Sequence, residues 1–99
     1  MRKLNKNEVG VKLFGSSHRG SIMTSYDRLV ELFGEPTSNG SSDGKVRVEW
    51  VIQFNGYCFS IYDWKEDKPL TEVKQFEIGG NSPSGYFIEE LTKRVLYYV

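Results

Sequence analysis

Hydrophobic and polar residues alternate through the middle of the chain. Between residues 45 and 54 the even positions are apolar, and after Asn55-Gly56 the apolar residues fall on odd positions up to 61. A period of two predicts strands, and Asn-Gly is a favoured dipeptide of the two-residue type I′ turn. The pattern therefore predicts a β-hairpin with one apolar face. Its register pairs Phe54 with Tyr57, Ile52 with Phe59, Trp50 with Ile61 and Val48 with Asp63.

Two other stretches show the helical spacing of apolar residues. The first covers residues 26–33, where Ser25 or Thr24 can cap the N-terminus and Gly34 and Pro36 end the helix. The second follows Ser84, with acidic residues early and basic residues late, as the helix dipole favours. The apolar stripes are Tyr26, Leu29, Val30 and Phe33 in the first helix and Phe87, Ile88, Leu91 and Val95 in the second.

Weaker signals complete the expected order of elements. Residues 9–15 alternate as a strand does, SSHRG at 16–20 is typical of a turn, and residues 21–24 indicate a second, weaker strand. We expect a further strand at 73–78, a glycine-rich turn at 79–84 and a frayed segment at 1–8. The order β(β)αβββα predicts a single α+β domain over 1–99, in which an antiparallel sheet of four to five strands carries two helices on one face.

Composition and charge exclude several classes of function. The 99 residues include 13 Lys and Arg and 13 Asp and Glu, so the net charge is zero, which argues against a DNA mimic and against a DNA-coating protein. We expect no sequence-specific DNA binding. No apolar run reaches the roughly 18 residues of a membrane span, so we expect a soluble, cytoplasmic protein with no membrane partner. A single histidine and a single cysteine, Cys58, argue against a zinc site, and we expect no metal, no cofactor and no catalytic residues.

The segment IYDWK at 61–65 carries the densest group of side chains suited to binding. On the more polar face of the hairpin we expect Tyr62 and Trp64 beside Arg47, with Lys65 and Lys74 close by. Aromatic rings with cationic neighbours can stack a base and neutralise a phosphate, and the same residue types form hot spots for protein partners. A cross-strand aromatic pair covered by a loop is the structural alternative.

Further candidate residues lie outside this segment. His18 and Arg19 lie in GSSHRG, where a flanking glycine would let the backbone approach a ligand, although a solvated turn has the same sequence. Gly79-Gly80-Asn81-Ser82 precedes a helix and superficially suggests an anion cradle, but it lacks the P-loop lysine and the GxGxxG spacing. Carboxylates such as Glu49 and Glu77 fit either an acid/base pair or surface ion pairs.

Four motifs resemble a group of small phage-encoded accessory proteins. They are SYDRLVELFGEPT at 25–37, VEWVIQFNG at 48–56, IYDWK at 61–65 and FEIGGNS at 76–82. The resemblance implies an anti-defence protein that binds a host protein stoichiometrically, as anti-CRISPR proteins do, or that sequesters a nucleotide signal. It carries over no catalytic residues. The leading hypothesis is therefore a non-enzymatic inhibitor of a host antiviral defence component. The alternative is an oligomeric sponge for a nucleotide immune signal, which leaves a homo-oligomer open.

Overall fold

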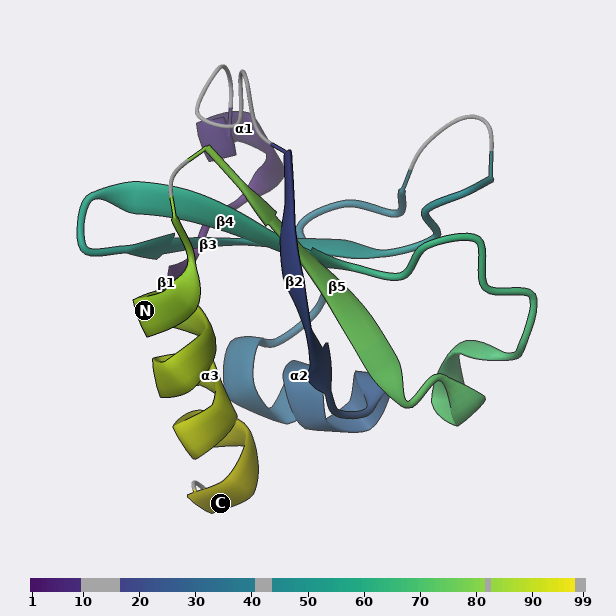
Figure 1. The fold of residues 1–99 in the computed structure, drawn as a ribbon. Helices are drawn as coiled ribbons and strands as arrows, with labels where there is room; N and C mark the ends of the chain where they lie inside the picture. Colours follow the sequence, from purple (N-terminus) through teal and green to yellow (C-terminus); the bar gives the residue numbers. More distant parts are fainter. Residues whose placement is uncertain (10–16, 41–43, 82, 98–99) are drawn as a thin grey trace.

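The computed structural model describes residues 1–9, 17–40, 44–81 and 83–97. Within them the chain forms a twisted sheet with helices on both sides (Figure 1). The elements are β1 (Arg2–Lys3), α1 (Lys6–Val9), β2 (Ser17–Met23), α2 (Tyr26–Phe33), β3 (Glu49–Phe54), β4 (Tyr57–Tyr62), a 3₁₀ turn (Leu70–Glu72), β5 (Gln75–Gly80) and α3 (Gly85–Tyr97). The predicted α+β class is confirmed.

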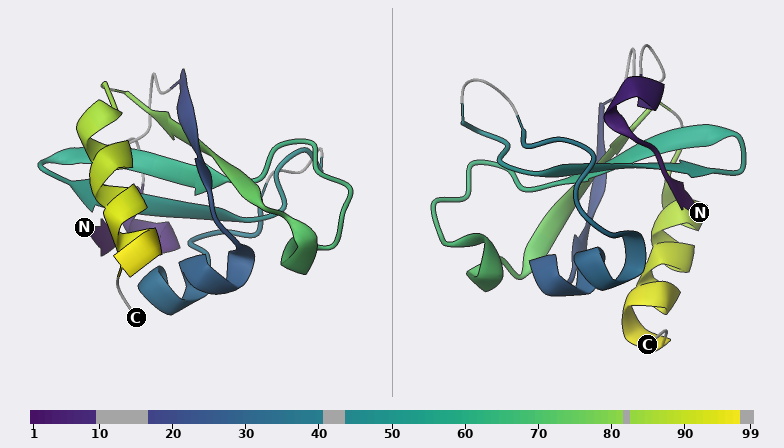
Figure 2. Two further views of the ribbon diagram at one scale, coloured as in Figure 1. Left: turned by 60° about the horizontal axis from the view of Figure 1, so that its bottom comes forward. Right: turned by 180° about the vertical axis from the view of Figure 1, so that it is seen from behind.

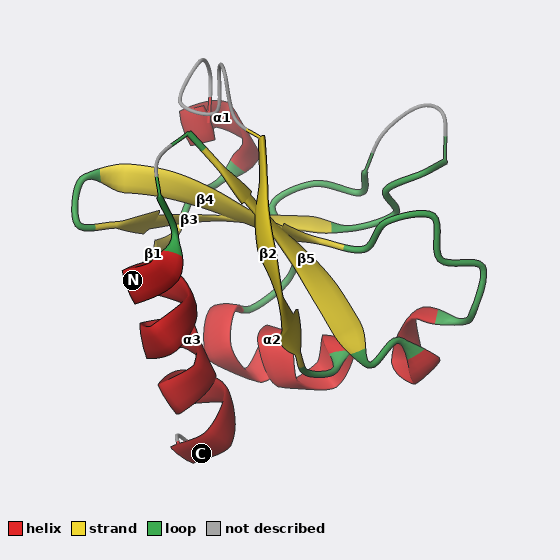
Figure 3. Cartoon of the chain, in the orientation of Figure 1, coloured by secondary structure: helices red, strands yellow, loops and turns green. Residues whose placement is uncertain are grey.

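All neighbouring strands are antiparallel, in the order β1-β3-β4-β5-β2 (Figure 3). The β3–β4 hairpin has the predicted turn, because Asn55 and Gly56 have φ angles of 52° and 81°. The ladder runs from Phe54 opposite Tyr57 to Glu49 opposite Tyr62, so the predicted register is confirmed along the whole ladder. Beyond it, the expected pair of Val48 and Asp63 is joined differently, because the Val48 amide donates to the Asp63 side chain.

The main core lies between one face of the sheet and the helices α2 and α3, as predicted. Ser25 caps α2 by accepting a hydrogen bond from the Arg28 amide, and Gly34 ends it with a φ of 83°. Trp50 is fully buried at the centre, and its indole Nε1 donates to the Gly34 carbonyl at 3.0 Å. The buried residues are Ile22, Leu29, Val48, Trp50, Ile52, Phe59, Ile61, Val73, Phe76, Ile78, Phe87 and Leu91.

The N-terminal segment at 1–8 was expected to be frayed, and this expectation is wrong because the segment pairs with the sheet. Arg2 and Lys3 form β1 against β3, and the Leu4 amide donates to the Val51 carbonyl at 2.8 Å. Leu4, Val51 and Cys58 form a second buried cluster on the sheet face opposite α2 and α3. The short helix α1 follows on this side (Figures 1 and 2), so part of the second face is covered.

The structure also changes the expected strands at the other edge of the sheet. The expected strand at 9–15 lies outside the described residues, except for Val9, which ends α1. The expected turn at SSHRG and the weak strand after it are wrong as separate elements, because residues 17–23 form the single strand β2, with a register shift between His18 and Gly20. Gly79 and Gly80 belong to β5 and not to a turn.

Candidate functional site

The uncovered part of the second sheet face, here called the outer face, is built by strand register. Glu49, Tyr62 and Glu77 are direct neighbours in one row across β3, β4 and β5. In the next row, Ser60 lies opposite Gly79, and Gly79 lies opposite His18 of β2. Because side chains alternate along each strand, these residues project to the side opposite the main core. Two small residues therefore adjoin a row of large polar ones, which leaves a depression in the sheet surface.

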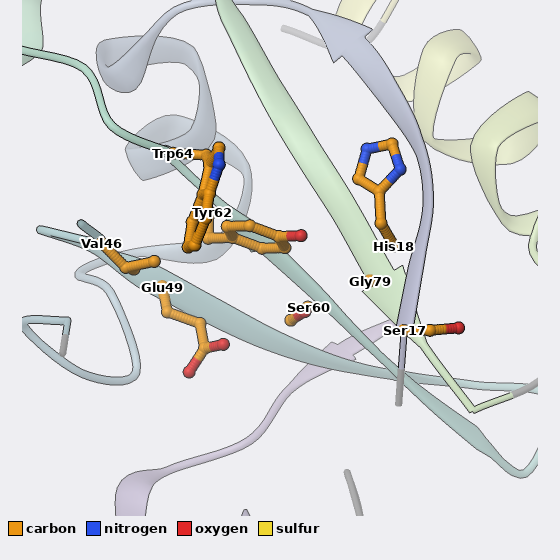
Figure 4. A pocket seen from close by; sticks show the side chains of 8 residues that line it. All are labelled: Ser17, His18, Val46, Glu49, Ser60, Tyr62, Trp64 and Gly79. Carbon is orange, nitrogen blue, oxygen red and sulfur yellow. The ribbon is translucent and has the colours of Figure 1, made fainter. Parts of the chain in front are cut away.

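Two adjoining hollows, whose linings share His18, Tyr62 and Trp64, occupy this depression. The outer pocket has a volume of about 500 Å³ and is lined by His18, Tyr62, Trp64 and Glu77. The adjoining hollow, of about 310 Å³, is lined by Ser17, His18, Val46, Glu49, Ser60, Tyr62, Trp64 and Gly79. In Figure 4 the Tyr62 hydroxyl points from β4 toward His18 across Gly79, with Trp64 on the opposite side of the hollow from His18. We call the two hollows together the outer-face site.

Gly79 allows the Tyr62 ring to lie close to the sheet. A Cβ atom at this position would be 2.8 Å from Ser60 Oγ and 3.3 Å from Tyr62 Cε1. Any larger residue would push the ring away from β5 or displace the serine. The sequence suggested that this glycine lies in a turn, but it lies within a strand and allows the Tyr62 ring to approach the backbone closely.

The carboxylates of the site have different surroundings. Glu77 is paired, since His18 Nε2 lies 3.0 Å from its Oε1 and Gln75 Nε2 donates to its Oε2 at 3.3 Å. Burial raises the pKa of Glu49, and a side-chain hydrogen bond with Ser38 opposes that shift. Burial also raises the pKa of Tyr62, and the charges of Glu77 and Glu49 raise it further. The Tyr62 hydroxyl therefore lies in a region of negative potential.

Trp64 forms the exposed wall of the site, and two lysines lie near its ring. The residue is 48% exposed, and the Nζ atoms of Lys45 and Lys65 lie 6.0 and 5.4 Å from its ring centroid. The two lysines come together because the Lys65 amide donates to the Lys45 carbonyl at 2.7 Å, and Lys65 itself has a φ of 54°. An indole ring with ammonium groups over it is a cation–π arrangement. The loop-covered alternative for this aromatic pair is wrong for Trp64, which is open to solvent.

Arg47, expected beside these rings, is engaged by Asp63. The Asp63 carboxylate is fully buried and accepts from the Arg47 amide at 2.8 Å, the Val48 amide at 3.0 Å and Arg47 Nε at 2.9 Å. Neither hollow is lined by Arg47. The pair instead fastens residues 47–48 to the end of β4, between Tyr62 and Trp64.

Three other candidate residues divide between the site and its surroundings. His18 lines both hollows. Arg19, at the irregularity of β2, donates from Nε to the Gly80 carbonyl at 3.0 Å. Lys74 precedes β5, where its carbonyl accepts from the Thr24 amide at 3.0 Å. Neither Arg19 nor Lys74 lines a hollow, and Lys65 adjoins the site through Trp64.

Sequence reasoning gave no ligand-binding role to Glu49, Glu77 or Lys45. The hairpin register could have indicated the first of them, since a two-residue turn at Asn55-Gly56 places Glu49 opposite Tyr62. Glu77 required the pairing of β5 with β4, and Lys45 required the positive φ of Lys65, neither of which has a local sequence signal.

Comparison with known proteins gives no relative. No family model, no curated protein and no solved structure matches the chain. Among the described residues, no three His, Cys, Asp or Glu side chains gather as a metal site would require. The helices of the described parts of the chain are all too short or too polar to span a membrane.

Proposed function

We propose that this protein acts by stoichiometric binding through the outer-face site and that it inhibits a host antiviral defence protein. The observation that carries the binding role is the open hollow of about 500 Å³ walled by Tyr62 and the half-exposed Trp64. Trp and Tyr are the residue types enriched in interface hot spots, and lysine stems around Trp64 extend the contact surface. The choice of a host defence protein as partner rests on the resemblance to phage-encoded accessory proteins.

A nucleotide ligand is the second candidate, and the lysines at Trp64 favour it. A base could stack on Trp64 while Lys45 and Lys65 neutralise a phosphate. Two features weigh against this candidate. Arg47 is occupied by Asp63, and the two glycines expected in an anion cradle are hydrogen-bonded strand residues.

Titration against purified host defence complexes tests the proposal. We expect a CRISPR effector or another defence complex to bind at a fixed molar ratio and to lose activity on binding. Trp64→Ala should weaken that binding by roughly 30-fold or more, which corresponds to a hot-spot loss of about 2 kcal/mol.

Tyr57→Ala is the matched control for the loss of an aromatic side chain. Tyr57 is similarly exposed, at 55%, but it lies at the hairpin turn and lines neither hollow. Equal binding by wild type and the Trp64 variant would show that the chosen face is wrong. Tight binding of a cyclic nucleotide, with no effect on any defence protein, would favour the nucleotide-sponge hypothesis over the inhibitor hypothesis.

A further inference from the structure

Glu49 is a carboxylate at the outer-face site for which the described residues provide no cationic partner. It is half-buried on β3 and lines the adjoining hollow with Tyr62. Among the described residues, the ion pairs of Lys, Arg and His involve other carboxylates, and none involves Glu49. A desolvated carboxylate without a cation is unfavourable, and binding of a cation would relieve that cost. The raised pKa of Glu49 is consistent with this unrelieved burial.

The ring of Tyr62 adds a second attraction for a cation. Tyr62 lies between Glu49 and Glu77 in the row across the sheet, so a group resting on the ring is near two carboxylates. The face of an aromatic ring carries negative partial charge and attracts cations as well. Ring and carboxylates therefore favour the same sign of charge, and they repel an anion from the base of the hollow.

The shape of the site favours a guanidinium group over an ammonium group. A guanidinium is planar, stacks on an aromatic face and donates two parallel hydrogen bonds to one carboxylate. Glu77 already accepts from Gln75 and is paired with His18. The Glu49 side chain hydrogen-bonds to the neutral Ser38 and has no ion pair with a described residue, so Glu49 is the carboxylate with more capacity for a bidentate contact with a cation. Lys65 lies over the ring of Trp64, where it would face an acidic group next to the inserted cation.

We propose that the outer-face site receives an arginine side chain of the partner protein, with the guanidinium stacked on Tyr62 and paired with Glu49. This inference rests on the proposed function, because it names the group that a protein partner inserts. Charge complementarity further favours an acidic residue beside that arginine, opposite Lys65. The partner segment is therefore an arginine next to a carboxylate.

Small probes test this inference without knowledge of the partner. The uniformly ¹⁵N-labelled protein is titrated with N-acetyl-arginine amide, with its lysine counterpart and with its neutral isostere, N-acetyl-citrulline amide, and amide shifts are followed. We expect the arginine probe to shift the signals of Glu49, Tyr62 and Gly79. The citrulline probe should bind about tenfold more weakly, since the loss of a charge-assisted hydrogen bond is worth at least about 1.4 kcal/mol.

Two charge-neutralising variants separate a specific contact from general attraction. Glu49→Gln should lower the affinity for the arginine probe about tenfold. Glu72→Gln, on the exposed 3₁₀ turn, should leave that affinity unchanged. Dispersed amide spectra of both variants confirm that each remains folded. A Glu77→Gln variant supplies a second measurement, with an expected smaller loss because Glu77 is already paired.

Each outcome decides between the proposals. Equal shifts by arginine and citrulline, or no loss in the Glu49 variant, would overturn the arginine site. If the arginine site were overturned in this way but Trp64→Ala still abolished inhibition of a defence protein, the proposed function would stand without an arginine site. Stronger shifts of the same signals by guanosine or adenosine monophosphate would overturn both and assign the site to a nucleotide.

Discussion

Replacement of the buried Asp63 by asparagine removes the charge that fixes the end of β4. Asp63 is 0% exposed and accepts three hydrogen bonds, two from backbone amides and one from Arg47 Nε at 2.9 Å. Asparagine has nearly the same shape but only one acceptor oxygen. Its amide group would meet an N–H donor, so at least one hydrogen bond and the whole ion pair are lost.

The expected loss of stability is about 3 kcal/mol. A hydrogen bond to a charged group contributes about 1.5–3 kcal/mol, and removal of one partner from a buried ion pair costs about 3–5 kcal/mol. The Arg47 side chain is 30% exposed, so water can solvate the released guanidinium, which favours the lower end of this range. For a domain of this size, about 3 kcal/mol lowers Tm by roughly 12–24 °C.

Thermal unfolding followed by circular dichroism measures the effect. Asp67→Asn is the matched control, because Asp67 is exposed in the loop after β4 and its replacement should change Tm by no more than about 4 °C. A Tm change of similar size in both variants would refute the role given to Asp63. In that case the three hydrogen bonds would contribute no net stability over solvated alternatives.

The same variant should weaken binding at the outer-face site. Asp63 lies between Tyr62 and Trp64 in the sequence, and its contacts with Arg47 and Val48 hold the segment that carries Lys45. Loss of these contacts loosens one wall of the hollow. The binding loss should appear at temperatures well below the lowered Tm, where the variant is folded.

Three further substitutions test single features of the structure. Gly79→Ala should destabilise the protein by about 1–3 kcal/mol in urea unfolding and weaken binding of the arginine probe, because the new methyl group would lie 2.8 Å from Ser60 Oγ and 3.3 Å from Tyr62 Cε1. Gly85→Ala places its methyl group in open space and should have neither effect. Glu49→Gln should raise Tm at neutral pH. Glu49 adds stability to the wild-type protein below the ordinary glutamate pKa of 4.5, and this stability is lost as the pH rises through the raised pKa. The Tm advantage of the variant should therefore grow as the pH rises above 4.5, and a constant difference would contradict this. Gly56→Ala should cost about 1 kcal/mol in the same urea assay because its φ is 81°, and an unchanged midpoint would refute the type I′ strain.

Local signals explain which parts of the fold were predictable. The hairpin and α2 have a clear hydrophobic period and definite end signals, namely Asn55-Gly56, Ser25 and Gly34. The N-terminal strand has no such signal, because only two residues pair and Leu4 alone anchors them in the second cluster. Its position depends on a neighbouring strand 50 residues away in the sequence, which no local pattern encodes.

The sheet edge and the glycines show a different reason for wrong predictions. In β2 only Ile22 is buried, so the strand lacks alternation and resembles a polar turn. Gly79 and Gly80 also resemble a turn, but the Tyr62 and Phe59 rings occupy the space beside them. Glycine has the same composition signal in both settings, and only the pairing of β4 with β5 distinguishes them.

The candidate site was predictable in its aromatic residues and not in its charges. The alternation of apolar and polar residues placed Tyr62 and Trp64 on the more polar face, and in the structure both residues line the two hollows. The partner of Arg47 depended on the chain beyond the ladder, where Asp63 turns inward to a fully buried position. A side chain that leaves the strand alternation cannot be assigned to a face by period alone.

The charge of the outer-face site depends on which carboxylate pairs with Arg47. Arg47 is two residues before Glu49 on the same segment, yet it pairs with the buried Asp63. This arrangement satisfies the carboxylate that cannot reach solvent. Among the described residues it leaves Glu49 without an ion pair, beside Tyr62 at an open hollow. Although the whole chain has no net charge, the base of the site is negative, and Lys65 at the Trp64 ring puts a positive charge at its rim. Recognition by such a site depends on the order of charges in the partner, a cation inside and an anion beside it, so reversing that order in a test peptide should abolish binding while its net charge stays the same.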